Sequence, residues 1–405
     1  MKKSMNLIKK IKTLAFLFLT LTFSLFLIDL LLHFFLLFSP QTSSIIFQKN
    51  PLIVDEQIGN IGNPNHPDHD RRGWRNKFAL SQANIVTLGD SHTYGTSVKV
   101  EESWPYLLRS KTGLQVYNMA LPGHSVGHSL LHLAEAKKLN PELIVLSIYF
   151  GNDFWEIMQL STFNHEISSF VPSDDKKKFI ELEKVDPMGE KWERLFGATI
   201  SSYGSYKLRV FMSKYSSIYG LLRAIKNQFD NRSNNLLDND MKISDLQMTD
   251  EQSNLTKTFE GEWTTILTPS LRNFVNDRTD ARIETGFYTT LDVLLSFRKK
   301  LQNDAELLIV LLPTKEAVFY SKVPESITNE NLNTLFNNET LNREDLKDFL
   351  ELNDFNFLDM TDNLSNSPVQ TYFRSADGHP NKYGHEVIAI SVEEWIQKEN
   401  LTFSN

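Results

Sequence analysis

Short apolar segments alternate with amphipathic helical segments in two parts of this 405-residue sequence. The apolar segments are rich in β-branched residues and leucine, as in strands that are buried on both faces. The expected strands are Ala83–Leu88, Val116–Met119, Leu143–Tyr149, Leu307–Leu312 and Phe355–Leu358. The expected helices are Trp104–Ser110, Leu130–Lys138, Leu291–Leu301 and Tyr383–Ile396. This alternation predicts an α/β fold in which helices cover both faces of a parallel, flavodoxin-like sheet, giving a three-layer α/β/α sandwich.

A long apolar run near the N-terminus indicates a membrane segment. The run Leu14–Phe38 follows lysines at positions 2, 3, 9, 10 and 12, and it exceeds the roughly 20 residues that cross a bilayer. No small-residue cleavage triplet precedes Ser39, so we expect an uncleaved transmembrane anchor. The basic cluster favours the cytoplasm, which places the rest of the chain on the non-cytoplasmic, periplasmic or extracytoplasmic side.

Two ionisable residues interrupt the apolar run. Asp29 and His33 are four residues apart, so they share one face of a helix. We expect them to lie near the outer interface or to pair with each other, and contact with a membrane partner is the alternative.

The sequence divides into three regions. Residues 1–40 form the basic tail and anchor, 41–80 a turn-rich linker or lead-in, and 81–400 the sheet domain. Residues 155–285 lack the strand–helix rhythm, and we expect a mainly helical insertion there. Its basic stretch 206–226 is expected to be a helix that caps the sheet or lies on a membrane surface. His66 and His69 are expected to be solvated linker residues.

Composition excludes several classes of function. The net charge of −8 provides no basic field for nucleic acid, and we expect no nucleic-acid partner. The chain contains no cysteine, which excludes disulfides, thiolate nucleophiles and cysteine-ligated metal sites. We expect no cofactor.

Polar motifs follow three of the expected strands. They are Gly89-Asp90-Ser91, Asn118 to Gly123, and Gly151-Asn152-Asp153. The carboxyl ends of parallel strands meet at one edge of the sheet, so these motifs should line one crevice. A serine at a strand-to-helix turn is exposed as a nucleophile. The backbone N–H groups of Ser91 and Gly123, with the Asn152 amide, would form an oxyanion hole.

A serine nucleophile needs a base, and the base needs an orienting carboxylate. The C-terminal segment Asp377-Gly378-His379-Pro380 provides both, just before the last expected helix. We therefore expect Ser91, His379 and Asp377 to form a catalytic triad. The residues around Ser91 are not G-x-S-x-G, which excludes the α/β-hydrolase nucleophile elbow.

These four segments, in this order, resemble the consensus blocks of the SGNH/GDSL hydrolase family. The resemblance covers about 80–155 and 285–400 and leaves the insertion unmatched. It implies Ser91 as nucleophile, Gly123 and Asn152 as oxyanion donors, and His379 with Asp377 as base and orienter, without a metal. The Asp-x-His spacing is one residue shorter than in many members and resembles the alginate O-acetylation branch.

Other polar residues are candidates for smaller roles. His92, next to the serine, is expected to form pocket wall or surface. His124, His128 and His132 follow one helical face and are expected to be solvated rather than to bind a metal, and His124 is a candidate substrate contact. Lys315 follows the fourth strand and is a second candidate substrate contact, with surface lysine as the alternative.

The leading functional hypothesis is hydrolysis of an acyl ester, of the kind carried as O-acetyl on envelope glycans, through an acyl-Ser91 intermediate. The sharpest alternative transfers the acyl group to a sugar hydroxyl, with a membrane protein as candidate acyl donor. A non-catalytic glycan-binding protein on the same fold is the third reading.

Overall fold

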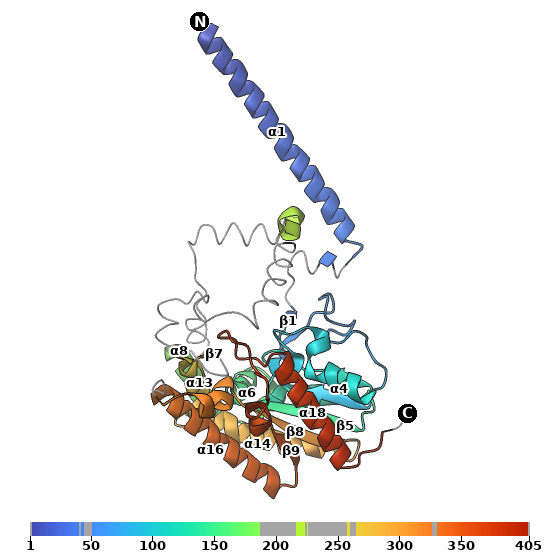
Figure 1. The fold of residues 1–405 in the computed structure, drawn as a ribbon, viewed down its shortest axis with the longest axis vertical. Helices are drawn as coiled ribbons and strands as arrows, with labels where there is room; N and C mark the ends of the chain where they lie inside the picture. Colours follow the sequence, from blue (N-terminus) through green and yellow to red (C-terminus); the bar gives the residue numbers. More distant parts are fainter. Residues whose placement is uncertain are drawn as a thin grey trace. The chain divides into compact units, whose positions relative to one another are not determined.

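The computed structural model describes residues 2–39, 42–43, 51–186, 216–222, 225, 257–259, 265–325 and 330–403. The chain divides into two compact units, which we describe separately. The first comprises Met1–Pro51, Asn65–Pro67 and Thr199–Asn239. The second comprises Leu52–Pro64, Asp68–Ala198 and Asp240–Asn405, and it contains the sheet (Figure 1).

The first unit is built on the long helix α1 (Lys2–Leu36). Its segment Lys12–Leu36 is long and apolar enough to cross a membrane, a property that a signal sequence shares. Residues 217–222 are helical and belong to the same unit. A helix is expected over the basic stretch 206–226. Of this stretch, the structure describes only residues 216–222 and 225.

The second unit contains a five-stranded sheet in the order β4-β3-β5-β8-β9. The strands are β3 (Ile85–Leu88), β4 (Val116–Asn118), β5 (Leu143–Tyr149), β8 (Glu306–Leu312) and β9 (Asn356–Asp359). All neighbouring pairs are parallel. Numbered along the chain within this sheet, the order is 2-1-3-4-5, so the predicted flavodoxin-like topology is confirmed.

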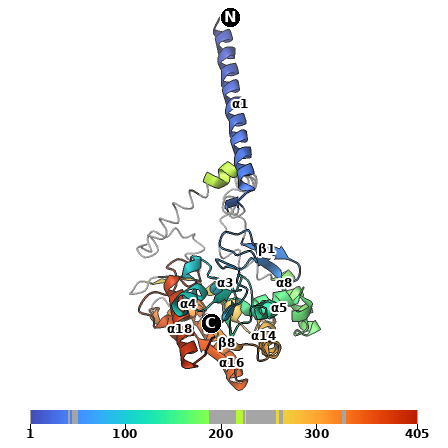
Figure 2. The same cartoon turned by 90° about the vertical axis from the view of Figure 1, so that its right-hand side faces the viewer.

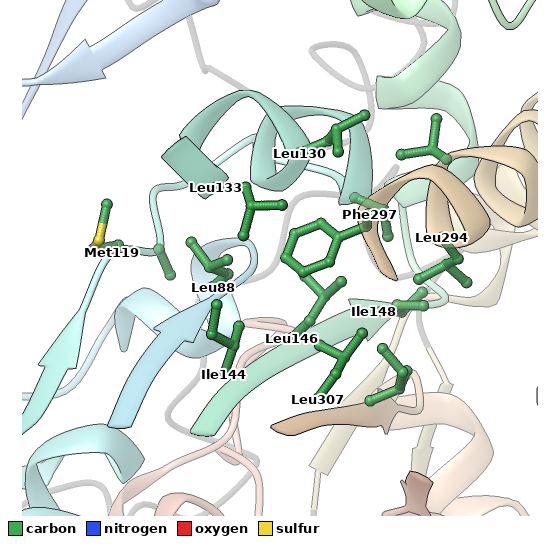
Figure 3. Close-up of a cluster of buried hydrophobic side chains, with 14 of the residues drawn as sticks. Leu88, Met119, Leu130, Leu133, Ile144, Leu146, Ile148, Leu294, Phe297 and Leu307 are labelled. Carbon is green, nitrogen blue, oxygen red and sulfur yellow. The ribbon is translucent and has the colours of Figure 1, made fainter. Parts of the chain in front are cut away.

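Helices cover both faces of the sheet. One apolar cluster joins alternate strand residues to α5 (Val126–Lys137), α6 (Asp153–Ser161), α14 (Ala281–Leu301) and α16 (Glu330–Leu352). The other joins the intervening strand residues to α4 (Trp104–Thr112), α15 (Lys315–Phe319), α17 (Thr361–Ser365) and α18 (Lys382–Lys398). In Figure 3, Phe297 of α14 packs with Leu133 of α5 above Leu146 of β5. The two buried faces explain why the strands are continuous apolar runs.

The lead-in from Leu52 to residue 80, apart from Asn65–Pro67, belongs to the sheet unit. It begins with the antiparallel strands β1 (Leu52–Asp55) and β2 (Gly59–Gly62). Trp74 enters the first apolar cluster, and its indole N–H donates to Glu135 at 3.1 Å. His69 is buried and bonds the Asn63 carbonyl oxygen and the Tyr94 hydroxyl, so the expectation that it is solvated is wrong.

The described part of the insertion is mainly helical. It comprises α6, α7 (His165–Ser168), α8 (Ser173–Val185) and α13 (Pro269–Asn276), with one short antiparallel pair, β6 (Lys257–Phe259) and β7 (Thr265–Leu267). Residues 187–215, 223–224, 226–256 and 260–264 lie outside the description. Helix α14 starts at Ala281, ten residues before the expected Leu291, and its N-terminal half packs on α6, where Gly286 and Phe287 lie against Phe154.

Candidate active site

The turn after β3 presents Ser91 as the first residue of the short helix α3 (Ser91–Tyr94). Gly89 precedes it with φ = +147°, and a Cβ there would lie 2.0 Å from the Ser147 hydroxyl oxygen. Only glycine fits this position. Asp90 then caps α3, accepting the His92 backbone N–H at 2.9 Å. The strand end and the cap therefore fix the direction in which the serine leaves the sheet.

Ser91 stands at one end of a hydrogen-bonded chain of three side chains. Its hydroxyl is 3.0 Å from His379 Nε2, and His379 Nδ1 is 2.6 Å from Asp377 Oδ1. If Nδ1–H donates to the carboxylate, Nε2 is left to accept the serine proton. The structure thus brings together the three residues that the sequence singled out as a triad, although Ser91 and His379 lie 288 positions apart.

The carboxylate of Asp377 is held ionised. Burial favours its neutral form, but the hydrogen bonds and charge of His379, with a hydrogen bond from Ser97, outweigh burial and lower the pKa of Asp377 below its ordinary value. The Ser97 hydroxyl donates to Oδ2 at 2.6 Å. Sequence reasoning missed Ser97, because it lies in an ordinary polar loop after α3.

Lys315 lies beneath the loop that carries Asp377 and His379. Its side chain is 1% exposed, and its ammonium donates to the carbonyl oxygens of Phe373 at 2.7 Å, Ser375 at 2.6 Å and Asp377 at 3.2 Å. These bonds support the loop, and the candidate role of Lys315 as a substrate contact stays a prediction.

Arg272 of α13 connects two parts of the site, and it belongs to no recognisable sequence motif. The guanidinium donates to the Gly151 carbonyl oxygen at 3.1 Å and lies over the Tyr149 ring at 5.6 Å. A Cβ at Gly378 would lie 2.6 Å from its Nη2, so the glycine between Asp377 and His379 makes room for the arginine. The end of the insertion therefore contributes directly to this region.

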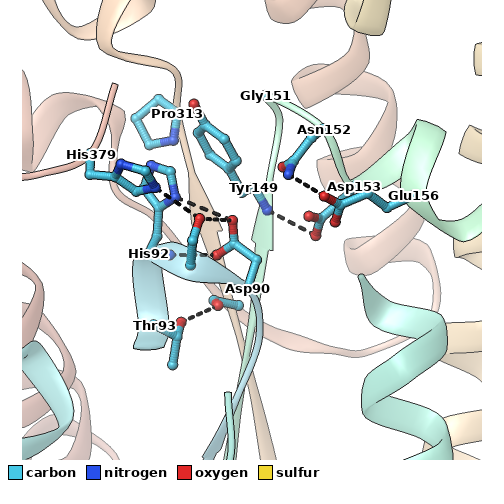
Figure 4. Close-up of polar contacts among 12 residues, drawn as sticks. Asp90, His92, Thr93, Tyr149, Gly151, Asn152, Asp153, Glu156, Pro313 and His379 are labelled. Carbon is cyan, nitrogen blue, oxygen red and sulfur yellow. Dashed lines mark hydrogen bonds and ion pairs between the residues drawn. The ribbon is translucent and has the colours of Figure 1, made fainter. Parts of the chain in front are cut away.

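Two of the three expected oxyanion donors, Asn152 and Gly123, lie near the same carboxyl group. Asn152, the N-cap residue of α6, donates its Nδ2–H to Glu156 Oε1 at 2.5 Å. A Cβ on Gly123 would be 3.9 Å from that same oxygen. In Figure 4, Tyr149 lies between His379 on one side and Asn152 with Glu156 on the other.

Glu156 changes how the Asn152 amide can be oriented. Within the described chain, Asn152 Oδ1 and Glu156 Oε2 are buried without a hydrogen-bond partner. Burial, with the nearby charge of Asp90, raises the pKa of Glu156 to about 8, so its carboxyl is protonated at neutral pH. The two ends of an amide have nearly the same shape. With the amide turned over, the Glu156 O–H donates to Oδ1, and Nδ2–H is released for another acceptor.

His92 is neither surface nor an open pocket wall. It is 1% exposed, and its ring packs 3.7 Å from the Tyr149 ring and 4.9 Å from the His379 ring, measured between centroids. Burial lowers the pKa of His92 despite Asp90, whose Oδ2 is 3.2 Å from His92 Nδ1. The neutral His92 ring packs against the His379 imidazole and helps to hold it in place.

The three histidines on the α5 side are buried, so the expected solvated face is wrong. His124 stacks on His128 and His132, and its Nε2 lies 3.0 Å from Asn60 Oδ1. The β1–β2 pair thus covers His124, and its candidate role as a substrate contact stays a prediction. Burial lowers the pKa of His128 to about 3 and of His132 to about 4. No cluster among the described residues has the ligands for a metal ion.

A separate cavity of about 640 Å³ opens at the other edge of the sheet. Asn84, Gln115, Glu142 and Ala305, each immediately before a strand, line it. None of the triad residues contributes to this cavity, which lies at the amino ends of the strands.

Comparison with known proteins gives similarities to hydrolases at low identity. No family model and no curated protein matches the sequence. Among solved structures, a GDSL-like lipase from Bacteroides thetaiotaomicron is 10% identical with a TM-score of 0.33, covering 78% of this chain and 88% of that chain. An extracellular lipase from Streptomyces rimosus is 13% identical with a TM-score of 0.32, covering 76% of this chain and 99% of that chain. Similarity at this level assigns neither a family nor an activity, so the chemistry has to follow from the site.

Proposed function

We propose that the protein is a serine-dependent acyl-ester hydrolase of the SGNH/GDSL type. The observation that carries the proposal is the chain from the Ser91 hydroxyl through His379 to Asp377, at 3.0 and 2.6 Å. Nucleophile, base and orienting carboxylate are at hydrogen-bond distance and in the order that acyl transfer requires.

The proposed reaction proceeds in two steps. His379 Nε2 takes the hydroxyl proton as Ser91 Oγ attacks the ester carbonyl, and the resulting imidazolium, stabilised by Asp377, returns the proton to the leaving alcohol. Water, activated by the same imidazole, then hydrolyses the acyl-serine. The developing oxyanion is assigned to the backbone N–H groups of Ser91 and Gly123 and to the Asn152 amide.

The proposed substrates are O-acyl groups on glycans of the cell envelope. This assignment combines the reaction with the N-terminal helix: the segment Lys12–Leu36, preceded by lysines, would hold the enzyme in the membrane and the catalytic unit on the non-cytoplasmic side. The same acyl-serine can pass its acyl group to a sugar hydroxyl, which would make the protein an O-acyltransferase.

One experiment separates these outcomes. The full chain in detergent is incubated with an acetyl ester, with and without oligosaccharides, and free acetate and acetylated sugar are measured separately. Release of acetate that depends on Ser91 supports the hydrolase, and acetylated sugar formed at the expense of acetate supports the transferase. No acyl-enzyme by intact-protein mass, and the same turnover in Ser91→Ala, would refute both.

A further inference from the structure

The ionisable pair of the apolar helix has partners in a distant part of the chain. Asp29 Oδ1 accepts the Ser216 hydroxyl at 3.0 Å and the Ile218 backbone N–H at 2.8 Å. His33 Nδ1 is 3.1 Å from the hydroxyl of Ser217, which is fully buried. Figure 2 shows the short helix beside the end of α1. The contacts therefore join the middle of the insertion to α1 within one compact unit.

The position of Asp29 along α1 places this contact at the membrane boundary. Asp29 is 17 residues beyond Lys12, which corresponds to about 26 Å of helix at about 1.5 Å per residue. A hydrocarbon core is about 30 Å thick, so Asp29 would lie just inside its far edge and His33 at the interface. A carboxylate at that depth is costly unless it is hydrogen-bonded. Ser216 and Ile218 provide those bonds.

The segment that docks there also carries exposed apolar side chains. Leu222 is 62% exposed, and Leu221 and Ile225 are also exposed. The neighbouring surface of α1 consists of exposed leucine, isoleucine and phenylalanine. Apolar side chains of two segments that meet at the edge of a bilayer bury their surface when lipid covers them.

We propose that residues 216–222 form a second membrane-contacting segment, which docks on α1 through Asp29 and His33 and inserts Leu222 into lipid. The inference rests on the proposed anchoring by α1. It makes the insertion a second attachment of the chain to the membrane rather than a cap on the sheet.

The absence of cysteine makes the test direct, because each single-cysteine variant carries one label. Full-length Leu222→Cys, Leu19→Cys and Leu352→Cys are labelled with an environment-sensitive fluorophore. They are then reconstituted in vesicles of phosphatidylcholine and phosphatidylglycerol that contain spin-labelled lipid. Leu19 reports on α1, and Leu352, 84% exposed on α16, is the control outside the unit. We expect several-fold stronger quenching at positions 19 and 222 than at 352.

The outcomes distinguish the inference from the anchor on which it rests. If the label at position 19 is quenched but the label at position 222 is quenched no more than the label at position 352, the inference is overturned and the anchor remains. The vesicles contain no other protein, so a segment that needs a protein partner gives that same result. No quenching at either 19 or 222 would refute both the anchor and the inference.

Asp29 variants test the docking itself. Asp29→Asn keeps an oxygen that accepts the Ser216 and Ile218 donors, whereas Asp29→Leu removes the acceptor and makes α1 more apolar, so α1 stays inserted. In Asp29→Leu we expect quenching at 222 to fall to the level of 352 while quenching at 19 is unchanged. Asp29→Asn should keep the wild-type pattern. Equal quenching at 222 in both variants would refute docking through Asp29.

Discussion

Asp377 holds His379 at two points, through the ring Nδ1 at 2.6 Å and through the backbone N–H at 2.9 Å. One carboxylate oxygen accepts both bonds, which closes a tight turn of the kind that aspartate forms with the residue two positions on. The other oxygen accepts from Ser97. The shortened Asp-x-His spacing therefore gives a carboxylate that fixes both the position and the tautomer of the imidazole.

The first prediction concerns the nucleophile and base. Ser91→Ala and His379→Ala should each lower kcat by about four orders of magnitude or more, since loss of either residue disables the attack. The double variant should be little worse than either one. Additive losses in steady-state ester hydrolysis would show that the two side chains do not act as a unit.

The second prediction concerns the carboxylate. Asp377→Asn can still accept the His379 backbone N–H, but its amide favours the imidazole tautomer that cannot take the serine proton. We expect kcat to fall by about 10⁴ with a nearly unchanged fold by circular dichroism. Ser97→Ala, which removes one hydrogen bond to the same carboxylate, should lose roughly tenfold or less. Equal effects of the two variants would contradict this assignment.

The third prediction concerns Lys315. Lys315→Met removes the donor that three loop carbonyl oxygens share, and each buried unsatisfied group costs about 1–3 kcal/mol. We expect lower thermal stability, faster hydrogen exchange at 373–379 and a fall in kcat with KM nearly unchanged. Lys322→Met, on a partly exposed lysine nearby in sequence, is the matched control. A change in KM alone would instead favour the substrate contact that the sequence suggested.

The fourth prediction concerns the buried histidines beside β1 and β2. The pKa of His132 is lowered to about 4 by burial, and in the unfolded chain it is about 6.5. Between those values the unfolded state binds the extra proton, so stability contributed by neutral His132 is complete above pH 6.5 and is lost as pH falls toward 4. His132→Phe keeps a ring against Trp74 and should show a smaller fall in Tm from pH 7 to 5. His165→Phe, at an exposed position, should keep the wild-type pH dependence.

The sequence predicts the sheet and the proximity of Ser91, His379 and Asp377, because both follow from local patterns. Runs such as Leu143–Tyr149 are apolar on both faces, and polar motifs at strand ends converge in any parallel sheet. The burial of His124 and Lys315 could not be predicted, because each is covered by a segment distant in sequence, Asn60 and the loop at 373–377 respectively. Arg272 and Glu156 belong to the insertion, whose packing has no periodic signal.

The last prediction concerns Glu156 and the Asn152 amide. Three charged groups lie near the carboxyl of Glu156: Asp90 from the turn after β3, Asp153 from the same helix and Arg272 from α13. The neighbouring helices α5 and α14 approach α6 through Gly127 and Gly286, which carry no titratable side chain. Its pKa, raised to about 8, means that the protonated carboxyl can donate to Asn152 Oδ1 below pH 8, which leaves Nδ2–H for the oxyanion.

Above pH 8 the carboxylate instead accepts Nδ2–H, so kcat should fall as pH rises through about 8 while KM changes little. Glu156→Gln keeps an N–H donor at every pH and should lose this alkaline decline. Glu156→Leu offers no donor and should be slow throughout.

Stability provides a readout that does not depend on turnover: the raised pKa favours the folded protein below about pH 4.3, and this advantage is lost as pH rises toward 8. The Tm of the wild type relative to Glu156→Gln should therefore decrease from pH 5 to 8. An unchanged alkaline limb in Glu156→Gln, with a Tm difference that does not vary with pH, would show that Glu156 is ionised and does not orient the amide.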